Sequence, residues 1–453
     1  MEFAREALTD LDAWSKRENH KPLILRGARQ VGKSTLVRMF ARQFDSYIEM
    51  NFEEYSTKEI FEQRLDFSEV LERILLKGSG EAAGGKTLIF FDEIQISPEA
   101  IRMLRFFYER RPDLYVIAAG SLLEFALEKV PSFPVGRVDF YYLNPLSFND
   151  FLRWTGKGAV AETLERIPFP KHLSQVLFEN YHKYLIIGGL PEVVANYAEN
   201  KSIAALQPVY LSIWQAYLDD VTKYGIGERE RETTQYVLSV APGQKDRIKF
   251  TGFGDSTFKA REVGSALRSL DLARVVQLIY PVTSTEPPLH IDHKKSPRLQ
   301  FLDTGLLNYT QEIQGELIGV KDFNDAYRGK IVQHMLAQEL MTSYNDRAYK
   351  PHFWVREKAN SASEVDLILR HGKYIFPVEV KSGPQGRLRS LHQFMDRTNH
   401  PYAIRFLRNN FSVERYETLA GTPYFLMNLP YFLMGQIREY ADYFVKHYSL
   451  EEE

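Results

Sequence analysis

The stretch "KPLILRGARQVGKST", residues 21–35, decides the fold of the first third of the chain. A short apolar run ends at a glycine, and a segment with helical spacing begins at Lys33. Between them, residues 27–34 match the pattern G-x-x-x-x-G-K-[ST]. Its glycines let backbone N–H groups face phosphate oxygens, its lysine reaches the β- and γ-phosphates, and its hydroxyl binds magnesium. Because the motif lies between a strand and a helix, a phosphate-binding loop is favoured over a chance glycine turn.

This loop is predicted to hold ATP together with Mg²⁺. The residues expected to line the nucleotide are Gly27, Ala28, Arg29, Gln30, Val31, Gly32, Lys33, Ser34 and Thr35. Lys33 is also expected to act in catalysis because its charge faces the phosphates. The positive N-terminal end of the following helix adds to phosphate binding.

A second set of polar residues follows two apolar strands. In "TLIFFDEIQ", residues 87–95, Asp92 ends a buried strand, where it is expected to hold Mg²⁺ together with Ser34. Glu93 is placed to polarise the attacking water. A buried acid is costly unless it serves a cation, which favours this role over a structural one. Ser121 ends the next strand, where it could sense the γ-phosphate or cap the following helix, and both readings stay open.

The composition is that of a folded, cytoplasmic protein of roughly three domains. Its 57 Lys and Arg against 59 Asp and Glu give a net charge of −2, so any contact with nucleic acid must come from a local patch. The absence of cysteine excludes disulfides, thiolate zinc sites and cysteine nucleophiles, and suits a reducing compartment. The most apolar stretch, residues 422–437, is interrupted by prolines and polar residues. It is expected to form core, with no membrane contact.

The continuous apolar runs "TLIFF" and "LYVIAAG" are joined by helical segments, which indicates an α/β fold with a parallel sheet covered on both faces. Residues 172–240 have a helical pattern, and residues 257–282 are predicted to form a helix, a turn, a second helix and a strand. A helix-turn-helix followed by a wing would fit that segment.

Residues 245–298 could form a nucleic-acid surface, because ten basic and six acidic side chains give 10 − 6 = +4. The basic residues are Lys245, Arg247, Lys249, Lys259, Arg261, Arg268, Arg274, Lys294, Lys295 and Arg298. DNA is therefore one candidate partner. Winged helices also bind proteins, so an unidentified protein partner is the alternative.

The segment "EVDLILRHGKYIFPVEVKSG", residues 364–383, resembles the core of PD-(D/E)XK nucleases. In that resemblance Asp366 and Glu379 bind Mg²⁺ and Lys381 orients the attacking water. Active members usually add a glutamate on the first helix, where this chain has Gln333, and Glu339 lies almost two turns later. Glu364 could compensate for the missing acid. We favour a retained nuclease fold with an inactive site over a working nuclease, because the set of ligands is incomplete.

The motifs "PLILRGARQVGKS", "IFFDEIQ", "AAGS" and "GRVDFYYLNPLSFNDFL" resemble the AAA+ ATPases of bacteria and archaea whose C-terminal half is a domain of unknown function. The likeness continues through "YLIIGGLPEVV", "LDTGLL" and "VEVKSG". It implies a P-loop ATPase core, a helical lid, a winged-helix-like segment and a nuclease-like C-terminal domain. The expected boundaries are 1–157, 170–235, 236–312 and 320–453, in that order.

The same resemblance suggests a role for Arg137, which precedes the strand "VDFYY". In AAA+ proteins an arginine at this place projects into the nucleotide of a neighbouring subunit, which would make the protein a homo-oligomer. The alternative is a surface arginine paired with an acid such as Asp139.

The leading hypothesis is a Mg²⁺-dependent ATPase that uses its cycle to move the C-terminal modules on a nucleic-acid or protein partner. A slow nucleotide-dependent signalling switch and an ATP-regulated DNA nuclease are the alternatives.

Overall fold

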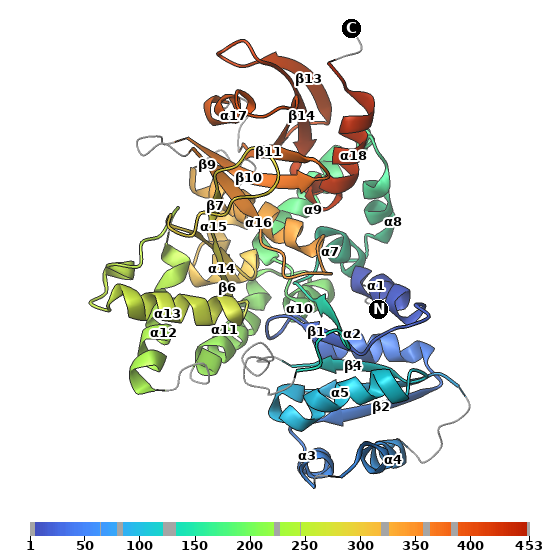
Figure 1. Cartoon of the computed structure of the whole chain (residues 1–453). Helices are drawn as coiled ribbons and strands as arrows, with labels where there is room; N and C mark the ends of the chain where they lie inside the picture. Colours follow the sequence, from blue (N-terminus) through green and yellow to red (C-terminus); the bar gives the residue numbers. More distant parts are fainter. Residues whose placement is uncertain are drawn as a thin grey trace.

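The structure is a computed structural model that describes residues 5–63, 65–78, 85–120, 133–221, 227–244, 246–318, 326–356, 363–381 and 388–450 (Figure 1). The blue N-terminal elements form one end of the molecule, and the orange and red C-terminal elements form the other (Figure 1). Green helices lie between these ends, and the yellow-green elements form a lobe at one side. Within the described ranges, no helix is long and apolar enough to cross a membrane.

The N-terminal sheet consists of parallel strands in the order β2-β3-β4-β1-β5. The strands are β1 (Leu23–Arg26), β2 (Ser46–Asn51), β3 (Thr87–Asp92), β4 (Tyr115–Ala119) and β5 (Asp139–Tyr142). All carboxyl ends of parallel strands lie at one edge of the sheet, so the loop after β1 and the acids after β3 share that edge. The predicted α/β fold with a parallel sheet is confirmed.

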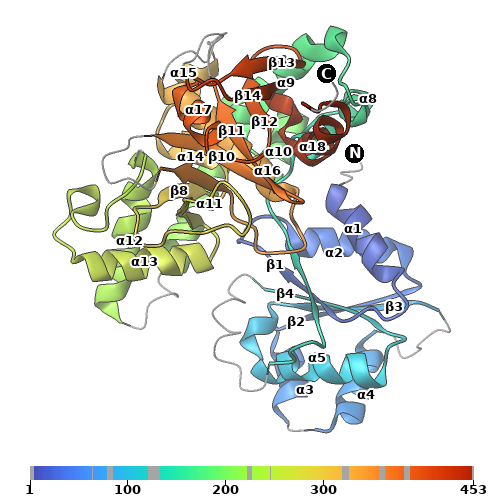
Figure 2. The same cartoon turned by 45° about the horizontal axis from the view of Figure 1, so that its top comes forward.

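Helices cover both faces of this sheet, as the unbroken apolar strands predicted (Figure 2). Successive side chains of a strand point to opposite faces, so Leu23 and Leu25 enter one core and Ile24 the other. The first core contains α1 (Glu6–Ser15) and α2 (Lys33–Phe40). The second core contains α3 (Tyr55–Glu62), α4 (Phe67–Lys77) and α5 (Pro98–Arg110).

A group of helices connects the N-terminal sheet to the C-terminal half. Its members are α7 (Phe148–Trp154), α8 (Gly158–Ala161), α9 (Ser174–Ile187), α10 (Pro191–Asn200) and α11 (Gln207–Val221). α9 packs against α14 (Thr304–Thr310), α15 (Gln314–Ile318) and the 3-10 helix η8 (Tyr431–Gln436). The helical segment predicted after the first domain is present, and its first long helix lies within the C-terminal half.

The lobe at the side contains α12 (Glu228–Val240), α13 (Ala260–Leu272) and an antiparallel pair of strands, β6 (Val276–Ile279) and β8 (Arg298–Phe301). The expected helix, turn and helix in residues 257–282 is wrong, because this segment holds one helix followed directly by strands. Arg274 ends the helical region with a left-handed φ of +60°. The β-branched run that follows then pairs with β8.

The C-terminal sheet is mixed and has the order β13-β14-β12-β11-β10-β9-β7. Its elements are β7 (Pro281–Val282), α16 (Ala326–Thr342), β9 (His352–Val355), β10 (Glu364–His371), β11 (Tyr374–Val380), α17 (Arg389–Met395), β12 (Tyr402–Leu407), β13 (Ser412–Glu417), β14 (Pro423–Pro430) and α18 (Ile437–His447). Residues 423–434 include the buried strand β14 and the start of η8, which confirms that this apolar stretch is core. The edge strand β7 comes from the lobe, so the lobe and the C-terminal half share one sheet.

A buried carboxylate, Asp303, joins the helices at the centre of the molecule. Its Oδ2 accepts hydrogen bonds from the Gly189 backbone N–H (2.6 Å) and from Gln338 Nε2 on α16 (3.2 Å). Its Oδ1 accepts from the Leu306 N–H (2.9 Å) and so caps α14. Burial raises the pKa of Asp303 to about 6, and these hydrogen bonds act in the opposite direction.

The two glycines between α9 and α10 let the chain pass close to Asp303. Gly188 has a φ of +75°, and a Cβ there would lie 2.2 Å from Asp303 Oδ1. A Cβ on Gly189 would lie 2.3 Å from the carbonyl oxygen of Leu146. The motifs "IIGGLP" and "LDTGLL" are thus two sides of one close contact.

Replacing Gly189 by alanine is expected to lower the free energy of unfolding by about 1–3 kcal/mol, because the added methyl group must displace backbone. Urea denaturation followed by tryptophan fluorescence measures the effect. Gly158→Ala is the matched control, since no atom lies within 4 Å of its added Cβ. Equal unfolding midpoints for the two variants would contradict this assignment of the glycine pair.

Candidate functional site

The phosphate loop, residues 27–34, runs from the end of β1 into the first turn of α2. Gly27 has a φ of +152°, and a Cβ there would lie 2.4 Å from the carbonyl oxygen of Leu143. Gly32 precedes α2 in the left-handed region, with a φ of +83°. Both positions of the motif therefore require glycine for backbone reasons alone.

Lys33 lies inside this loop. Its Nζ donates hydrogen bonds to the carbonyl oxygens of Gly27 (3.0 Å) and Ala28 (2.8 Å), and the side chain is buried. Burial lowers the pKa of Lys33 to about 8, although the nearby Glu93 and Asp92 act to raise it. A cation held within the curve of the loop is suited to contact a phosphate.

Ser34 and Asp92, from the two predicted motifs, are hydrogen-bonded. Ser34 Oγ donates to Asp92 Oδ2 over 2.8 Å, and burial raises the pKa of Asp92. A hydroxyl beside a carboxylate is an oxygen donor set that fits Mg²⁺, which usually takes its other ligands from phosphate and water. Within the described residues, no group of three or more His, Cys, Asp or Glu is placed to hold a metal.

Glu93 follows Asp92 at the same edge of the sheet. Its backbone is left-handed, with φ +54° and ψ 39°, a conformation that costs a non-glycine residue about 1–3 kcal/mol and is concentrated at active sites. The sharp turn ends β3 and starts the 3-10 helix η2 (Ile94–Ile96). The Glu93 carboxylate accepts a hydrogen bond from Gln95 Nε2.

Residues outside the motifs also contact the phosphate loop. Arg5 donates to the carbonyl oxygen of Val31 (2.7 Å) and lies 3.8 Å from Asp150 on α7. Helix α11 contacts the loop at Arg29, where Tyr217 donates to the carbonyl oxygen (2.7 Å) and Asp220 pairs with the guanidinium (2.5 Å). Sequence reasoning missed these contacts, because no motif marks Arg5 in the charged N-terminal segment or Asp220 in a helix.

The structure places Arg137 at the edge of the sheet opposite to the loop, since Arg137 precedes β5 and the loop follows the parallel strand β1. Arg137 Nε lies 3.0 Å from Glu109 Oε1, and its side chain is 45% exposed. Arg137 is thus a surface arginine paired with an acid, as the alternative suggested, but the acid is Glu109, and Asp139 pairs with Arg17 at 3.2 Å. Ser121 lies outside the described residues.

The three residues of the nuclease-like motif meet where β10 begins and β11 ends. Asp366 Oδ2 accepts a hydrogen bond from the Val380 N–H (2.9 Å), and Lys381 Nζ donates to Glu379 Oε1 (2.5 Å). Burial, and then the neighbouring Asp366, raise the pKa of Glu379. Lys381 thus neutralises the acid beside it.

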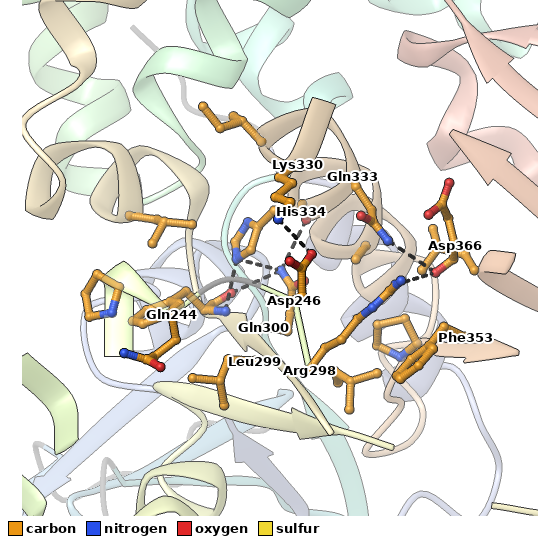
Figure 3. A pocket seen from close by; sticks show the side chains of 18 of the residues that line it. Gln244, Asp246, Arg298, Leu299, Gln300, Lys330, Gln333, His334, Phe353 and Asp366 are labelled. Atoms are coloured by element: carbon orange, nitrogen blue, oxygen red, sulfur yellow. Dashed lines mark hydrogen bonds and ion pairs between the residues drawn. The ribbon is translucent and has the colours of Figure 1, made fainter. Parts of the chain in front are cut away.

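An arginine from the lobe enters the same cluster. Figure 3 shows Arg298 and Gln333 both directed at Asp366, in a cavity of about 140 Å³ between β8, α16 and β10. Arg298 and Gln333 donate to the Asp366 carbonyl oxygen at 3.0 and 3.4 Å, and Arg298 also pairs with Glu364. Glu364, which the sequence suggested as a compensating metal ligand, instead forms an ion pair with an arginine. Sequence reasoning counted Arg298 in the basic patch and missed this contact.

Other members of the predicted basic patch also face the protein. Arg247 lies 3.9 Å from Glu364, and Lys295 Nζ donates to the carbonyl oxygen of Arg356 (3.4 Å). Arg274 lies over the ring of Tyr142 on β5, at 5.1 Å from its centroid. Lys245 is outside the described residues. Several basic side chains of this segment therefore contact other parts of the protein.

Comparison with known proteins gives three matches along the chain. The AAA domain family matches residues 19–152, which contain the loop, Asp92 and Glu93. The N-terminal part is an AAA-type P-loop ATPase domain. Two domains of unknown function, DUF8612 and DUF4143, match residues 178–317 and 328–425.

Similar whole proteins are distant. An uncharacterized protein of Methanocaldococcus jannaschii is 22% identical over 365 residues, which cover 75% of this chain and 72% of that protein. The solved Walker-type ATPase of Pyrococcus abyssi is 15% identical, with a TM-score of 0.45 over 68% of this chain and 96% of that one. The Orc1 protein of Aeropyrum pernix, solved with DNA, is 12% identical, with a TM-score of 0.26 over 68% and 90%.

Affinity for ATP is expected to fall as the pH rises above about 8, the pKa of Lys33 in the folded protein. Above that pH the lysine must take up a proton before its ammonium can face the phosphates, so binding should weaken by up to about tenfold per pH unit. Titration with a fluorescent ATP analogue between pH 7 and 9.5 measures this. Lys33→Ala is the control, with weak binding and no such trend. A flat profile in the wild-type protein would contradict the placement of Lys33.

Proposed function

We propose that this chain binds ATP with Mg²⁺ at residues 27–35 and hydrolyses it. The observation that carries the proposal is the arrangement at the edge of the N-terminal sheet. Lys33 lies within the phosphate loop, Ser34 is bonded to Asp92, and Glu93 is adjacent. In this proposal Lys33 binds the β- and γ-phosphates, while Ser34 and Asp92 hold the magnesium ion.

Glu93 is the residue to which we assign the activation of water. The oxygen of the water forms a bond to the γ-phosphorus as the bond between that phosphorus and the ADP oxygen breaks, and a proton of the water passes to the Glu93 carboxylate. Magnesium supplies charge stabilisation for the phosphate oxygens when it is bound. The turn at Glu93 directs its side chain from the same edge as the loop, which supports this role.

The proposal includes assembly into a homo-oligomer. Arg137 lies at the edge of the sheet opposite to the loop, so it can approach only a nucleotide bound by another subunit. Its exposed position supports this role, and its ion pair with Glu109 would have to open on assembly.

For the C-terminal half, we propose binding of a nucleic-acid or protein partner in place of DNA cleavage. The charges of Lys381 and Arg298 act on both Asp366 and Glu379, and Glu364 is paired with arginines. A magnesium ion would have to compete with both cations for two acids, both of which have a raised pKa because they are buried. This balance of charges supports a structural cluster.

Glu93→Gln is expected to keep ATP affinity and to lower the rate of hydrolysis by about 100-fold or more, because an amide cannot accept the proton of the water. The kcat of phosphate release and the Kd for ATP measure the two effects separately. Glu72→Gln, an exposed glutamate on α4, is the matched control and should behave as the wild type. Unchanged turnover in Glu93→Gln would mean that another group activates the water.

The wild-type protein is expected to leave supercoiled plasmid DNA intact in Mg²⁺, because its carboxylates are neutralised by arginine and lysine. An agarose-gel assay at neutral pH, with Asp366→Asn as the matched variant, should show no difference between the two proteins. Cutting by the wild type that disappears in Asp366→Asn and in Lys381→Ala would show that the cluster is a working nuclease site.

A further inference from the structure

Gln95 lies between the catalytic candidate Glu93 and the end of the neighbouring strand β4. Its Nε2 donates to Glu93 Oε2. Its Oε1 is buried and has no hydrogen-bond donor among the described residues. The orientation of the amide follows from chemistry, because a carboxylate can only accept and the NH₂ group must face Glu93.

The other side of Gln95 rests on Gly120, the residue that follows β4. A Cβ on Gly120 would lie 1.8 Å from Gln95 Oε1 and 2.8 Å from Cδ. Strand β4 is the neighbour of both β1 and β3, so Gly120 lies between the strands that carry the loop and the acids. Any side chain at position 120 would push Gln95 away from Glu93.

A purely space-filling residue at position 95 would not need an amide. A buried carbonyl oxygen without a donor is unfavourable, so an apolar side chain would fill this place better if packing were its only task. Unlike an apolar side chain, the amide can donate a hydrogen bond to Glu93. It holds one oxygen of Glu93 by a hydrogen bond to a charged group.

We propose that Gln95 is the positioning residue for Glu93 and that Gly120 is required to make room for it. This inference rests on the proposed ATP hydrolysis. The hydrogen bond from Gln95 holds the Glu93 carboxylate in one orientation at the end of β3. Gln95 acts through Glu93 and does not bind ATP.

The first test compares Gln95→Ala, Gly120→Ala and the double variant. Each single change should lower kcat by about 10- to 100-fold, with the KM and Kd for ATP within about threefold of wild type, because only the orientation of Glu93 is lost. The double variant should be no slower than Gln95→Ala, since removal of Gln95 also removes the clash. Gly158→Ala, which meets no atom within 4 Å, is the control with unchanged kcat.

The second test separates positioning from packing. Gln95→Met has nearly the size of the native residue but cannot donate a hydrogen bond to Glu93, so it keeps the packing and loses the orientation of the carboxylate. Its kcat should fall by about 10- to 100-fold, as in Gln95→Ala, with the Kd for ATP within about threefold of wild type. If Gln95 only filled space, Gln95→Met would keep the wild-type kcat.

The outcomes distinguish this inference from the proposal it rests on. If Glu93→Gln abolishes turnover while Gln95→Ala retains the wild-type kcat, the role of Gln95 is overturned and the ATPase proposal stands. Additive losses in the double variant, or a wild-type kcat in Gln95→Met, overturn it as well. If the wild-type protein does not hydrolyse ATP, both are overturned.

Discussion

The hydrogen bonds of the buried Asp303 carboxylate join three segments of the chain at the centre of the molecule. They fix the turn at Gly189, the start of α14 and, through Gln338, helix α16. The turn leads into Pro191, whose side chain lies against the loop at Gly32, where an added Cβ would be 3.4 Å from Pro191 Cγ. Helix α16 carries Gln333 to Asp366 at the other end. Through these contacts, one buried acid helps to position both the phosphate loop and the C-terminal cluster.

A second route joins the same two places. Arg5 bonds the loop at Val31 and pairs with Asp150 on α7. The first turn of α7 is bound by Glu339 of α16, which accepts from the Phe148 N–H at 3.1 and 3.0 Å and from Tyr184. Glu339 is thus a structural residue, consistent with its place away from the position of Gln333 on the helix. Both routes therefore connect the phosphate loop to α16 through buried polar contacts.

Sequence could predict those parts of the site that depend on neighbours in the chain. The phosphate loop is one continuous segment, and Asp92 ends a strand whose apolar pattern is unmistakable, so both were found. Arg298 could not be assigned, because its partner Glu364 lies 66 positions away on another sheet. The second helix expected after α13 fails for a similar reason, since the pairing of β6 with β8 decides the structure of that run. Charge counting along a segment does not say whether the charges face solvent or a neighbouring domain.

The edge strand β7 limits how this chain can be divided into fragments. It pairs with β9 through Pro281 and Val282, and the Thr283 carbonyl accepts from Trp354 Nε1 at 3.2 Å. The first matched domain of unknown function ends at residue 317, and the second begins at residue 328. Strand β7 belongs to the first of these domains and pairs within the sheet of the second, so the two domains share one sheet. A fragment that starts at α16 would expose the hydrogen-bonding edge of β9 and the side of Trp354, and such an edge pairs readily with other chains. A fragment of the C-terminal half that keeps this sheet complete must therefore include the lobe.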